Sequence, residues 1–388
     1  MDWALSSRLM THAPSAQADV GAIGRIATLC AVLEQEPLFH ASLGSKELFH
    51  SNLIAWFVDH HQRAAREVFG PWSRPAPGTK SAPTERERRH LDLVIHLEDV
   101  APLIVENKIF SPPRDDQLRD YAEHLATGYE PAPEFALLSL SDPGWSAGQS
   151  QLGGQLWRHH SYGDLAVAID ASLSLVSDSY AQETMRRYRS IIGALQEIAE
   201  IVTNKVTETT PFALPLAFGE QLQKVRLTQG FEKLRARSIA FFIQDHLARH
   251  DLAHVRVVDN YTRTWPLLES FVRVEGTHDE LGWQYQEGQW RLVVRVTKDH
   301  PCHGDGSTMR TQREAYASER YANWFDFTKV DTILGTSGPS TPKVGEYKGF
   351  APDFVYLYRP ARNATVGQLC ALAEVTAERA EQFGARLS

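Results

Sequence analysis

The chain has 388 residues, a formal net charge of −8 and 43% hydrophobic residues. This length exceeds one ordinary core, so we expect two domains, and the negative charge argues against broad, nonspecific capture of nucleic acid by the whole surface. No apolar run approaches membrane-spanning length and the first residues lack a basic-then-apolar signal, so the sequence predicts a cytoplasmic protein without a membrane partner. Three cysteines far apart in the sequence are typical of reduced thiols.

The N-terminal part predicts two helices. Residues 1–45 open with a polar tail, and the stretch DVGAIGRIATLCAVLEQEPLF then reads as a helix. A second helix is predicted over residues 46–69, because apolar residues recur there at helical spacing. Glu47 lies at its start. A loop rich in proline, glycine and serine, residues 70–83, separates this helix from the next elements.

The next two segments predict strands that carry polar residues between apolar ones. RRHLDLVIHLED alternates apolar and polar residues, which predicts a strand with Asp92 and Val94 on one face. LIVENKIF, residues 103–110, predicts a second strand, whose period of two puts Glu106 and Lys108 on the same face. Buried charges are costly unless they are paired or bound to a metal, so they indicate a functional site. A surface ion pair at a strand edge is the alternative interpretation.

The short link between these strands predicts a hairpin centred on Asp99. Antiparallel pairing then places Asp92 opposite Glu106. The same register sets Val94 opposite Ile104. Carboxylates placed face to face repel each other, so this register favours a divalent cation between them. A slip of one residue would turn Asp92 to the far face.

A helix and further strands come next. PPRDDQLRDYAEHLA predicts a helix opened by prolines and acids, with Gln117 and Tyr121 four residues apart on one face. Ordinary polar packing against the sheet is the alternative role for this pair. PEFALLSL predicts a strand, and LWRHHSYGDLAVAI predicts a strand that runs into a helix. A long helix is expected from about Ser179 to Thr203.

The pattern Asp92, then Glu106, Asn107 and Lys108, resembles the signature of the PD-(D/E)XK nuclease superfamily. The order of elements over roughly residues 40–200 is similar to the nuclease core: a helix with an acid, a strand with Asp, a strand with ExK, a helix with QxxxY, and a strand. ELFHSNLIAWFV and LIVENKI resemble a bacterial subgroup of the superfamily, and QxxxY resembles an element of RecB-like nucleases. The resemblance implies an α/β (α+β) restriction-endonuclease-like core, with a mixed central sheet flanked by helices.

The resemblance also implies an activity: a metal-dependent nuclease that hydrolyses phosphodiester bonds. DNA is the favoured substrate, and the sequence leaves the choice between DNA and RNA open. Mg²⁺ is the expected cofactor, and Mn²⁺ would substitute for it. The implied metal ligands are Glu47, Asp92, Glu106 and the backbone carbonyl of Asn107. Lys108 would act on the attacking water or on the developing negative charge. The alternative role of Glu47 is that of an acid favoured by the helix macrodipole.

Further residues are candidates for contacts with substrate. The resemblance implies that Gln117 and Tyr121 contact the nucleic-acid backbone or brace the lysine. Arg119 and the cluster ERERRH, with Arg88 and Arg89, would bind phosphates, because guanidinium groups match phosphate oxygens. A solvated charged surface is the alternative for this cluster.

A zinc site is not expected from the sequence. DHPCHGD offers only one thiol. The histidine pairs that stand out are adjacent in sequence rather than at ligand spacing: His60-His61 and His159-His160.

Polar residues and prolines at 203–215 predict a domain boundary, with a nuclease-like domain over residues 1–205 and a C-terminal domain over residues 215–388. The second domain reads as an α+β module: a helix LRARSIAFFIQDHLARH, a hairpin with its turn near Glu287-Gly288, a strand PDFVYLYRP and a closing helix. Its aromatic residues are candidates to stack on bases, although core packing is their commoner role: Trp283, Tyr285, Trp290, Trp324 and Phe325.

Three functions stay open at this point. The first is a DNA nuclease whose C-terminal domain selects the target, a protein partner or a second copy of the chain; the resemblance suggests defence against phage or foreign DNA. The second is a catalytically silent component that keeps the nuclease fold and binds nucleic acid or protein in a complex. The third is a toxin-like nuclease held silent by its C-terminal part.

Overall fold

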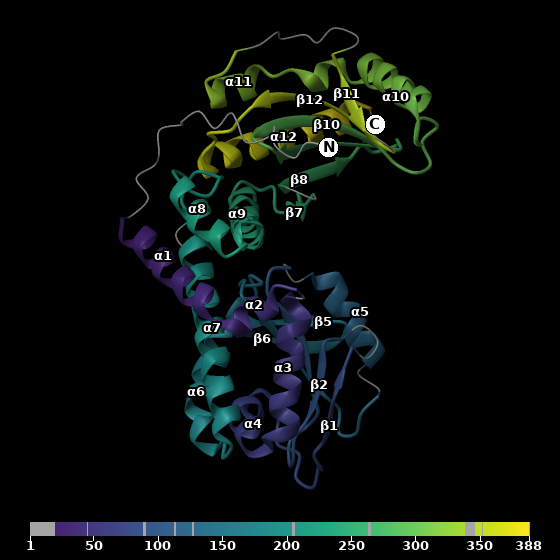
Figure 1. Cartoon of the computed structure of the whole chain (residues 1–388). Helices are drawn as coiled ribbons and strands as arrows, with labels where there is room; N and C mark the ends of the chain where they lie inside the picture. Colours follow the sequence, from purple (N-terminus) through teal and green to yellow (C-terminus); the bar gives the residue numbers. More distant parts are fainter. Residues whose placement is uncertain are drawn as a thin grey trace. The chain divides into compact units, whose positions relative to one another are not determined.

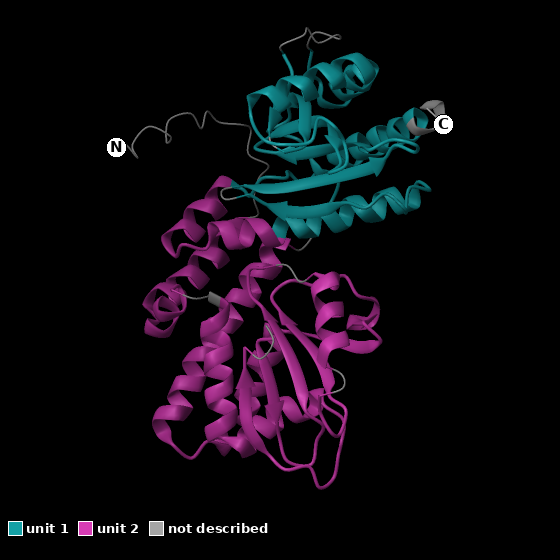
Figure 2. Cartoon of the chain, turned by 90° about the vertical axis from the view of Figure 1, so that its right-hand side faces the viewer, with its two compact units in different colours: residues 1–18, 205–215, 235–388 teal, residues 19–204, 216–234 magenta. Residues whose placement is uncertain are grey.

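The structure is a computed structural model that describes residues 20–44, 46–87, 91–111, 114–125, 128–203, 206–262, 265–337, 346–350 and 352–387. It divides into two compact units, which Figure 2 draws in different colours. Unit 2 comprises residues 19–204 and 216–234, and the described parts of unit 1 lie within 205–215 and 235–388. Both units combine helices with a β-sheet, in agreement with the predicted fold class.

Unit 2 is built on a six-stranded mixed sheet with the order β1-β2-β3-β4-β6-β5. Pairing is antiparallel from β1 to β3, parallel from β3 through β4 to β6, and antiparallel between β6 and β5. The central strands β2, β3 and β4 are almost wholly buried, because helices cover both of their faces. The strands are β1 (Ala82–Arg86), β2 (Leu93–His96), β3 (Leu103–Lys108), β4 (Glu134–Ser139), β5 (Gln149–Leu152) and β6 (Gln155–Ser161). The edge strand β1 lies where the predicted loop 70–83 meets the charged cluster ERERRH, and the short strand β5 was not predicted.

Helices pack on both faces of this sheet (Figure 1). Leu118 and Ala122 on α5 lie in one core cluster with Ile104 of β3, while α3 and α6 contact the strands from the other side. The single helix predicted over residues 46–69 is in fact two helices, because the backbone at His61 leaves the helical region. The helices are α1 (Val20–Gln35), α2 (Pro37–Ser42), α3 (Lys46–His60), α4 (Gln62–Phe69), α5 (Asp115–Leu125), α6 (Tyr162–Ser172), α7 (Ser179–Thr203) and α8 (Leu216–Lys224).

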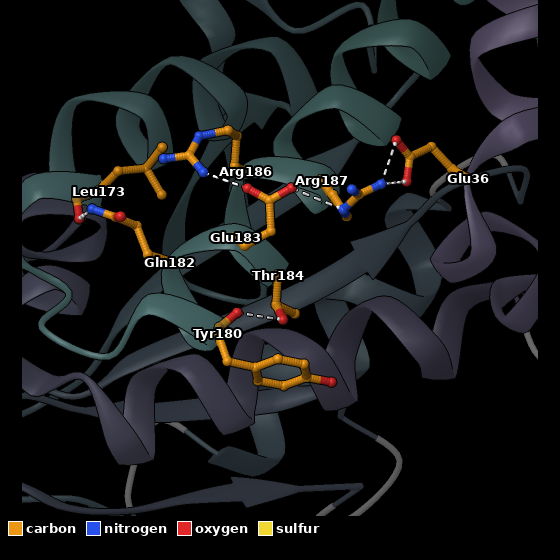
Figure 3. Close-up of polar contacts among 8 residues, drawn as sticks. All are labelled: Glu36, Leu173, Tyr180, Gln182, Glu183, Thr184, Arg186 and Arg187. Atoms are coloured by element: carbon orange, nitrogen blue, oxygen red, sulfur yellow. Dashed lines mark hydrogen bonds and ion pairs between the residues drawn. The ribbon is translucent and has the colours of Figure 1, made fainter.

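A chain of ion pairs runs along the N-terminal half of α7 (Figure 3). Nε of Arg187 lies 3.0 Å from Glu183 on the same helix, and its Nη1 lies 3.3 Å from Glu36, the residue before α2. Arg186 pairs with the other carboxylate oxygen of Glu183. Exposed pairs of this kind contribute little to stability, so the buried face of α7 is what fixes this helix in unit 2.

Unit 1 contains a six-stranded antiparallel sheet with the order β11-β12-β10-β9-β8-β7. Its strands are β7 (Val258–Tyr261), β8 (Pro266–Arg273), β9 (Asp279–Gln286), β10 (Gln289–Val296), β11 (Lys348–Phe350) and β12 (Phe354–Pro360). The predicted hairpin joins β9 to β10, and Glu287 and Gly288 both have positive φ (55° and 68°), as a two-residue hairpin turn of type I′ requires.

The helices of unit 1 are most of α9 (Thr228–Arg249), α10 (Ser307–Arg320), α11 (Thr328–Leu334) and α12 (Val366–Leu387). The five aromatic residues considered as base-stacking candidates all lie in its hydrophobic core, with at most 2% of each exposed. They therefore stabilise the fold, and a role in stacking on bases is excluded by their burial.

The observed units differ from the predicted domains in one segment. Helix α8 and the first turns of α9, residues 216–234, belong to unit 2, whereas the sequence analysis assigned them to the C-terminal domain. The prolines near residue 211 mark the end of a helix there, and such punctuation does not tell which core the next helix joins. Among the helices of the described residues, none is long and apolar enough to cross a membrane.

Candidate functional site

The hairpin of β2 and β3 has the predicted register. Leu93 pairs with Val105 and Val94 with Ile104. One further step along the same register sets Asp92, just before β2, opposite Glu106. The backbone amide of Asn107 donates a 2.7 Å hydrogen bond to Oδ2 of Asp92. The two acids are thus held on neighbouring strands at one end of the hairpin.

Glu106 and Lys108 meet on the face of β3 that α5 covers. Nζ of Lys108 lies 2.8 Å from Oε1 of Glu106, and the glutamate is 1% exposed. Gln117 on α5 donates from Nε2 to the same Oε1 at 3.4 Å and to the hydroxyl of Tyr121 at 2.5 Å. Gln117 therefore contacts the glutamate and Tyr121 contacts Gln117, while the predicted contacts of this pair with substrate or with the lysine stay predictions.

Glu47 lies in the first turn of α3, close to the acids of the hairpin. Its charge acts on Asp92, Glu106 and Lys108, raising the pKa of each. The Oε1 atom of Glu47 is buried and has no hydrogen-bond partner among the described residues. A helix N-terminal acid that only complements the macrodipole would face solvent, so this burial favours the functional interpretation of Glu47.

Asn107 fixes α3 and α6 to β3 from the face opposite to Glu106. Its side chain is fully buried; Nδ2 donates to Oγ of Ser51 at 3.0 Å and to the backbone oxygen of Glu47 at 3.3 Å. Tyr162, the first residue of α6, donates its hydroxyl to Oδ1 of Asn107. The side chain of Asn107 thus has a structural role that the sequence analysis, which considered only its backbone carbonyl, missed.

Two further residues support this arrangement and were not predicted: Ser51 and Tyr162. Ser51 stands one helical turn after Glu47, and Tyr162 follows the end of β6 at the start of a helix. Neither residue type is distinctive, and neither position differs from other positions of an amphipathic helix. Only the fold shows that they converge on Asn107, so no sequence signal identified them.

Burial and like charges raise the pKa values of both hairpin acids. Desolvation, then the charge of Asp92, raises the pKa of Glu106 to about 8 despite the ion pair with Lys108. Desolvation also raises the pKa of Asp92, against the hydrogen bond from Asn107. Burial alone would lower the pKa of Lys108, but the neighbouring acids outweigh it and the pKa is raised. Lys108 is therefore a protonated ammonium at neutral pH.

The donor set fits a divalent cation with a preference for oxygen ligands. Oε2 of Glu106 is buried and, like Oε1 of Glu47, has no hydrogen-bond partner among the described residues. Buried carboxylate oxygens normally find a donor, and an unpaired one is costly. A Mg²⁺ or Mn²⁺ ion satisfies such oxygens and lowers the repulsion between the acids.

Of the three arginine candidates, Arg119 lies among the described residues and does not join this cluster. Arg119 lies on the exposed side of α5 and, two positions after Gln117, does not share a helical face with it. Arg88 and Arg89 lie outside the described residues. The neighbouring Arg86 of β1 donates from Nη1 to Oδ1 of Asn52 on α3 at 2.8 Å, so this part of the charged cluster links two elements of the fold.

Comparison with known proteins finds one family. The model of one family, described as the PD-(D/E)XK nuclease superfamily, matches residues 38–190, which hold all the candidate acids, the lysine and the pair on α5. No curated protein and no solved structure matches the chain. The bacterial subgroup and the RecB-like element stay predictions from the sequence. Residues 38–190 of this chain are thus similar to the PD-(D/E)XK nuclease superfamily.

Proposed function

We propose that the chain is a metal-dependent nuclease that hydrolyses phosphodiester bonds in DNA. The observation that carries the proposal is the buried cluster of Asp92, Glu106 and Lys108, with Glu47 beside it, in a region similar to the nuclease superfamily. Such a cluster lowers the stability of the fold, because two buried carboxylate oxygens have no hydrogen-bond partner among the described residues. Its presence therefore indicates a functional role.

The acids would hold the cation. We propose Asp92 and Glu106 as ligands of the cation. Glu47 and the backbone carbonyl of Asn107 would be the further ligands that the protein supplies. When bound, the divalent ion supplies positive charge to the phosphoryl oxygens and lowers the pKa of water. Mg²⁺ commonly uses only one or two carboxylates and keeps several waters, so this ligand set suffices for it.

Lys108 would stabilise negative charge rather than accept a proton. Its ammonium lies 2.8 Å from Glu106, and its raised pKa keeps it protonated. A fixed cation in a buried site stabilises the charge that gathers on phosphorus oxygens in the transition state. This favours one of the two roles expected for the lysine, neutralisation of developing charge, over general base catalysis.

Gln117 would position Glu106 from α5. Its amide contacts the carboxylate oxygen that Lys108 also contacts, and it is itself held by the hydroxyl of Tyr121. A hydrogen bond from a neighbouring residue orients a metal-binding carboxylate. Arg119, exposed on the same helix, is the contact that we propose for substrate phosphates.

A substrate panel tests the proposal. Supercoiled, linear and single-stranded DNA, and RNA, are incubated with wild-type protein and with Glu106→Ala across Mg²⁺, Mn²⁺ and Ca²⁺. We expect cleavage of DNA that requires Mg²⁺ or Mn²⁺ and is lost in Glu106→Ala. DNA binding that persists with chelator, without cleavage of any substrate, would instead identify a catalytically silent binding component.

The biological setting that we propose is defence against phage or other foreign DNA. Plaque counts on cells that express wild type or Glu106→Ala test it, and equal counts would contradict it. Deleting residues 215–388 would also remove α8 and part of α9 from unit 2. Autoinhibition by the C-terminal part is therefore tested with a chain that ends after residue 234, for which increased cleavage supports a silenced toxin.

A further inference from the structure

Two histidines and a glutamate meet in unit 1, far along the chain from the nuclease cluster. Nε2 of His246 lies 2.8 Å from one carboxylate oxygen of Glu374, and Nδ1 of His250 lies 3.0 Å from the other. The two imidazole rings stack with their centroids 4.3 Å apart. The three ligand atoms of this group all lie within 4.8 Å of one another.

The positions of these residues follow from helix geometry. His246 lies in the last turn of α9 and His250 directly follows the helix, so their spacing of four puts both on one face. Glu374 lies on α12. The His-x-x-x-His spacing in HLARH is visible in the sequence and, unlike the adjacent histidine pairs, was not considered as a sign of a metal site.

The distances suit a small, tetrahedral ion. In zinc sites, histidine nitrogens and carboxylate oxygens lie about 2.0–2.2 Å from the metal, which sets neighbouring ligand atoms roughly 3.3 Å apart. The observed separations of 2.8 and 3.0 Å run to the two different oxygens of Glu374, and the three ligand atoms, one from each residue, lie within 4.8 Å of one another. Small side-chain movements would bring them to the spacing of a zinc site. His246, Glu374 and His250 are 15%, 25% and 44% exposed, so the group is accessible from solvent.

We propose that His246, His250 and Glu374 form a Zn²⁺ site that joins α9 to α12. Two imidazoles and one carboxylate select a borderline metal such as zinc over Mg²⁺, and three protein ligands leave a fourth position for water or another ligand. Cys370, one turn before Glu374, is buried in the hydrophobic core and does not belong to this group of ligand atoms. The Zn²⁺ site is separate from the site proposed for nuclease activity.

The competing explanation is that the two histidines only hydrogen-bond the glutamate. The same unit contains a comparison for that case: His254 lies against Glu381, also on α12, as a single pair. A pair lacks the third ligand, so its loss leaves zinc affinity unchanged. His254→Ala is therefore the matched control for His250→Ala.

The test is a competition titration of Zn²⁺ against a chromophoric chelator, with the full chain carrying Glu106→Gln so that the nuclease cluster contributes little. We expect one tightly bound Zn²⁺ per chain, retained in His254→Ala. In His250→Ala and in Glu374→Gln the affinity falls by about 100-fold or more, since losing even an outer partner of a metal ligand costs about 10–100-fold. His250 is nearly half exposed, so its replacement leaves the core intact.

A second measurement does not depend on affinity alone. Co²⁺ bound by two imidazoles and a carboxylate gives the strong visible absorption of a tetrahedral complex, whereas a site of oxygen ligands alone gives a weak octahedral spectrum. We expect the strong spectrum in the Glu106→Gln chain and in His254→Ala, and its loss in His250→Ala. Equal zinc affinity and equal Co²⁺ spectra in all variants, or no zinc retained against the chelator, would overturn the proposal.

Discussion

The backbone amide of Asn107 donates a 2.7 Å hydrogen bond to Oδ2 of Asp92, so the aspartate is fixed by the strand that carries the glutamate and the lysine. Turning the aspartate away would leave a buried backbone donor unpaired. The side chain of the same asparagine holds Ser51 on α3 and Tyr162 on α6. One residue thus orients an acid of the site and joins two helices to the sheet.

The packing behind β3 gives a test of stability. A Cβ atom at Gly230, in the first turn of α9, would lie 2.4 Å from the ring of Phe110, two residues after Lys108. Gly230→Ala is therefore expected to lower the free energy of unfolding by about 1–3 kcal/mol. Gly193→Ala in α7 meets no atom within 4 Å and is expected to raise it by about 0.5–1 kcal/mol, because alanine is favoured over glycine inside helices. Urea unfolding measures both, and a Gly230→Ala protein as stable as wild type would contradict this packing.

A buried histidine predicts how stability depends on pH. His50 is 1% exposed, its Nδ1 lies 3.1 Å from the hydroxyl of Tyr188, and burial lowers the pKa of His50 to about 3. In the unfolded chain its pKa is about 6.5, so between these values the unfolded state binds the extra proton. Stability from His50 is present above pH 6.5 and is lost as pH falls, by up to about 1.4 kcal/mol per pH unit.

Chemical unfolding of wild type and His50→Gln from pH 7.5 to 4.5 measures this effect. The difference between their two pH profiles isolates His50 from the other titrating groups. Wild type is expected to lose more stability than the variant as pH falls below 6.5. Parallel profiles would show that His50 is not held in its neutral form.

Glu106 predicts how metal affinity depends on pH. Because desolvation and Asp92 raise the pKa of Glu106 to about 8, the glutamate must release a proton before it binds a cation. Mn²⁺ affinity in the Glu374→Gln background is expected to rise by about tenfold per pH unit from pH 6 to 8 and then level off. Electron paramagnetic resonance of free Mn²⁺ measures it. A flat profile that Glu106→Gln does not alter would exclude Glu106 as a ligand.

The hydrogen bond from Gln117 predicts a positioning role. Gln117→Ala is expected to slow Mg²⁺-dependent cleavage by about 10–100-fold, because Glu106 loses the amide that orients it. Mn²⁺ affinity should weaken in the same variant, which a contact to substrate alone would not cause. Gln196→Ala removes a similar glutamine-to-glutamate bond, to Glu200 on α7, and should change neither quantity. Unchanged Mn²⁺ affinity in Gln117→Ala would instead favour a contact with substrate.

The sequence predicted the hairpin that carries the candidate site, but it did not predict the contacts that other elements make with this hairpin. Alternation with a period of two fixed the faces of Asp92, Glu106 and Lys108, and the short link fixed their register, because both effects are local. The contacts of Asn107 with Ser51 and Tyr162 join residues more than 50 positions apart, which no local pattern encodes. The His246 and His250 spacing was visible in the sequence, but its third member, Glu374, is brought there only by the fold.

The most direct measurement of the central claim is the rate of plasmid cleavage with Mg²⁺ by wild type, Lys108→Ala and Lys224→Ala. Lys224 hydrogen-bonds Gln221 on the surface of α8 and serves as the matched lysine control. We predict that Lys108→Ala keeps its circular dichroism spectrum and its Mn²⁺ binding yet loses about 10²–10³-fold or more in rate, while Lys224→Ala cleaves like wild type. A Lys108→Ala protein that folds and cleaves DNA at the wild-type rate would contradict the account.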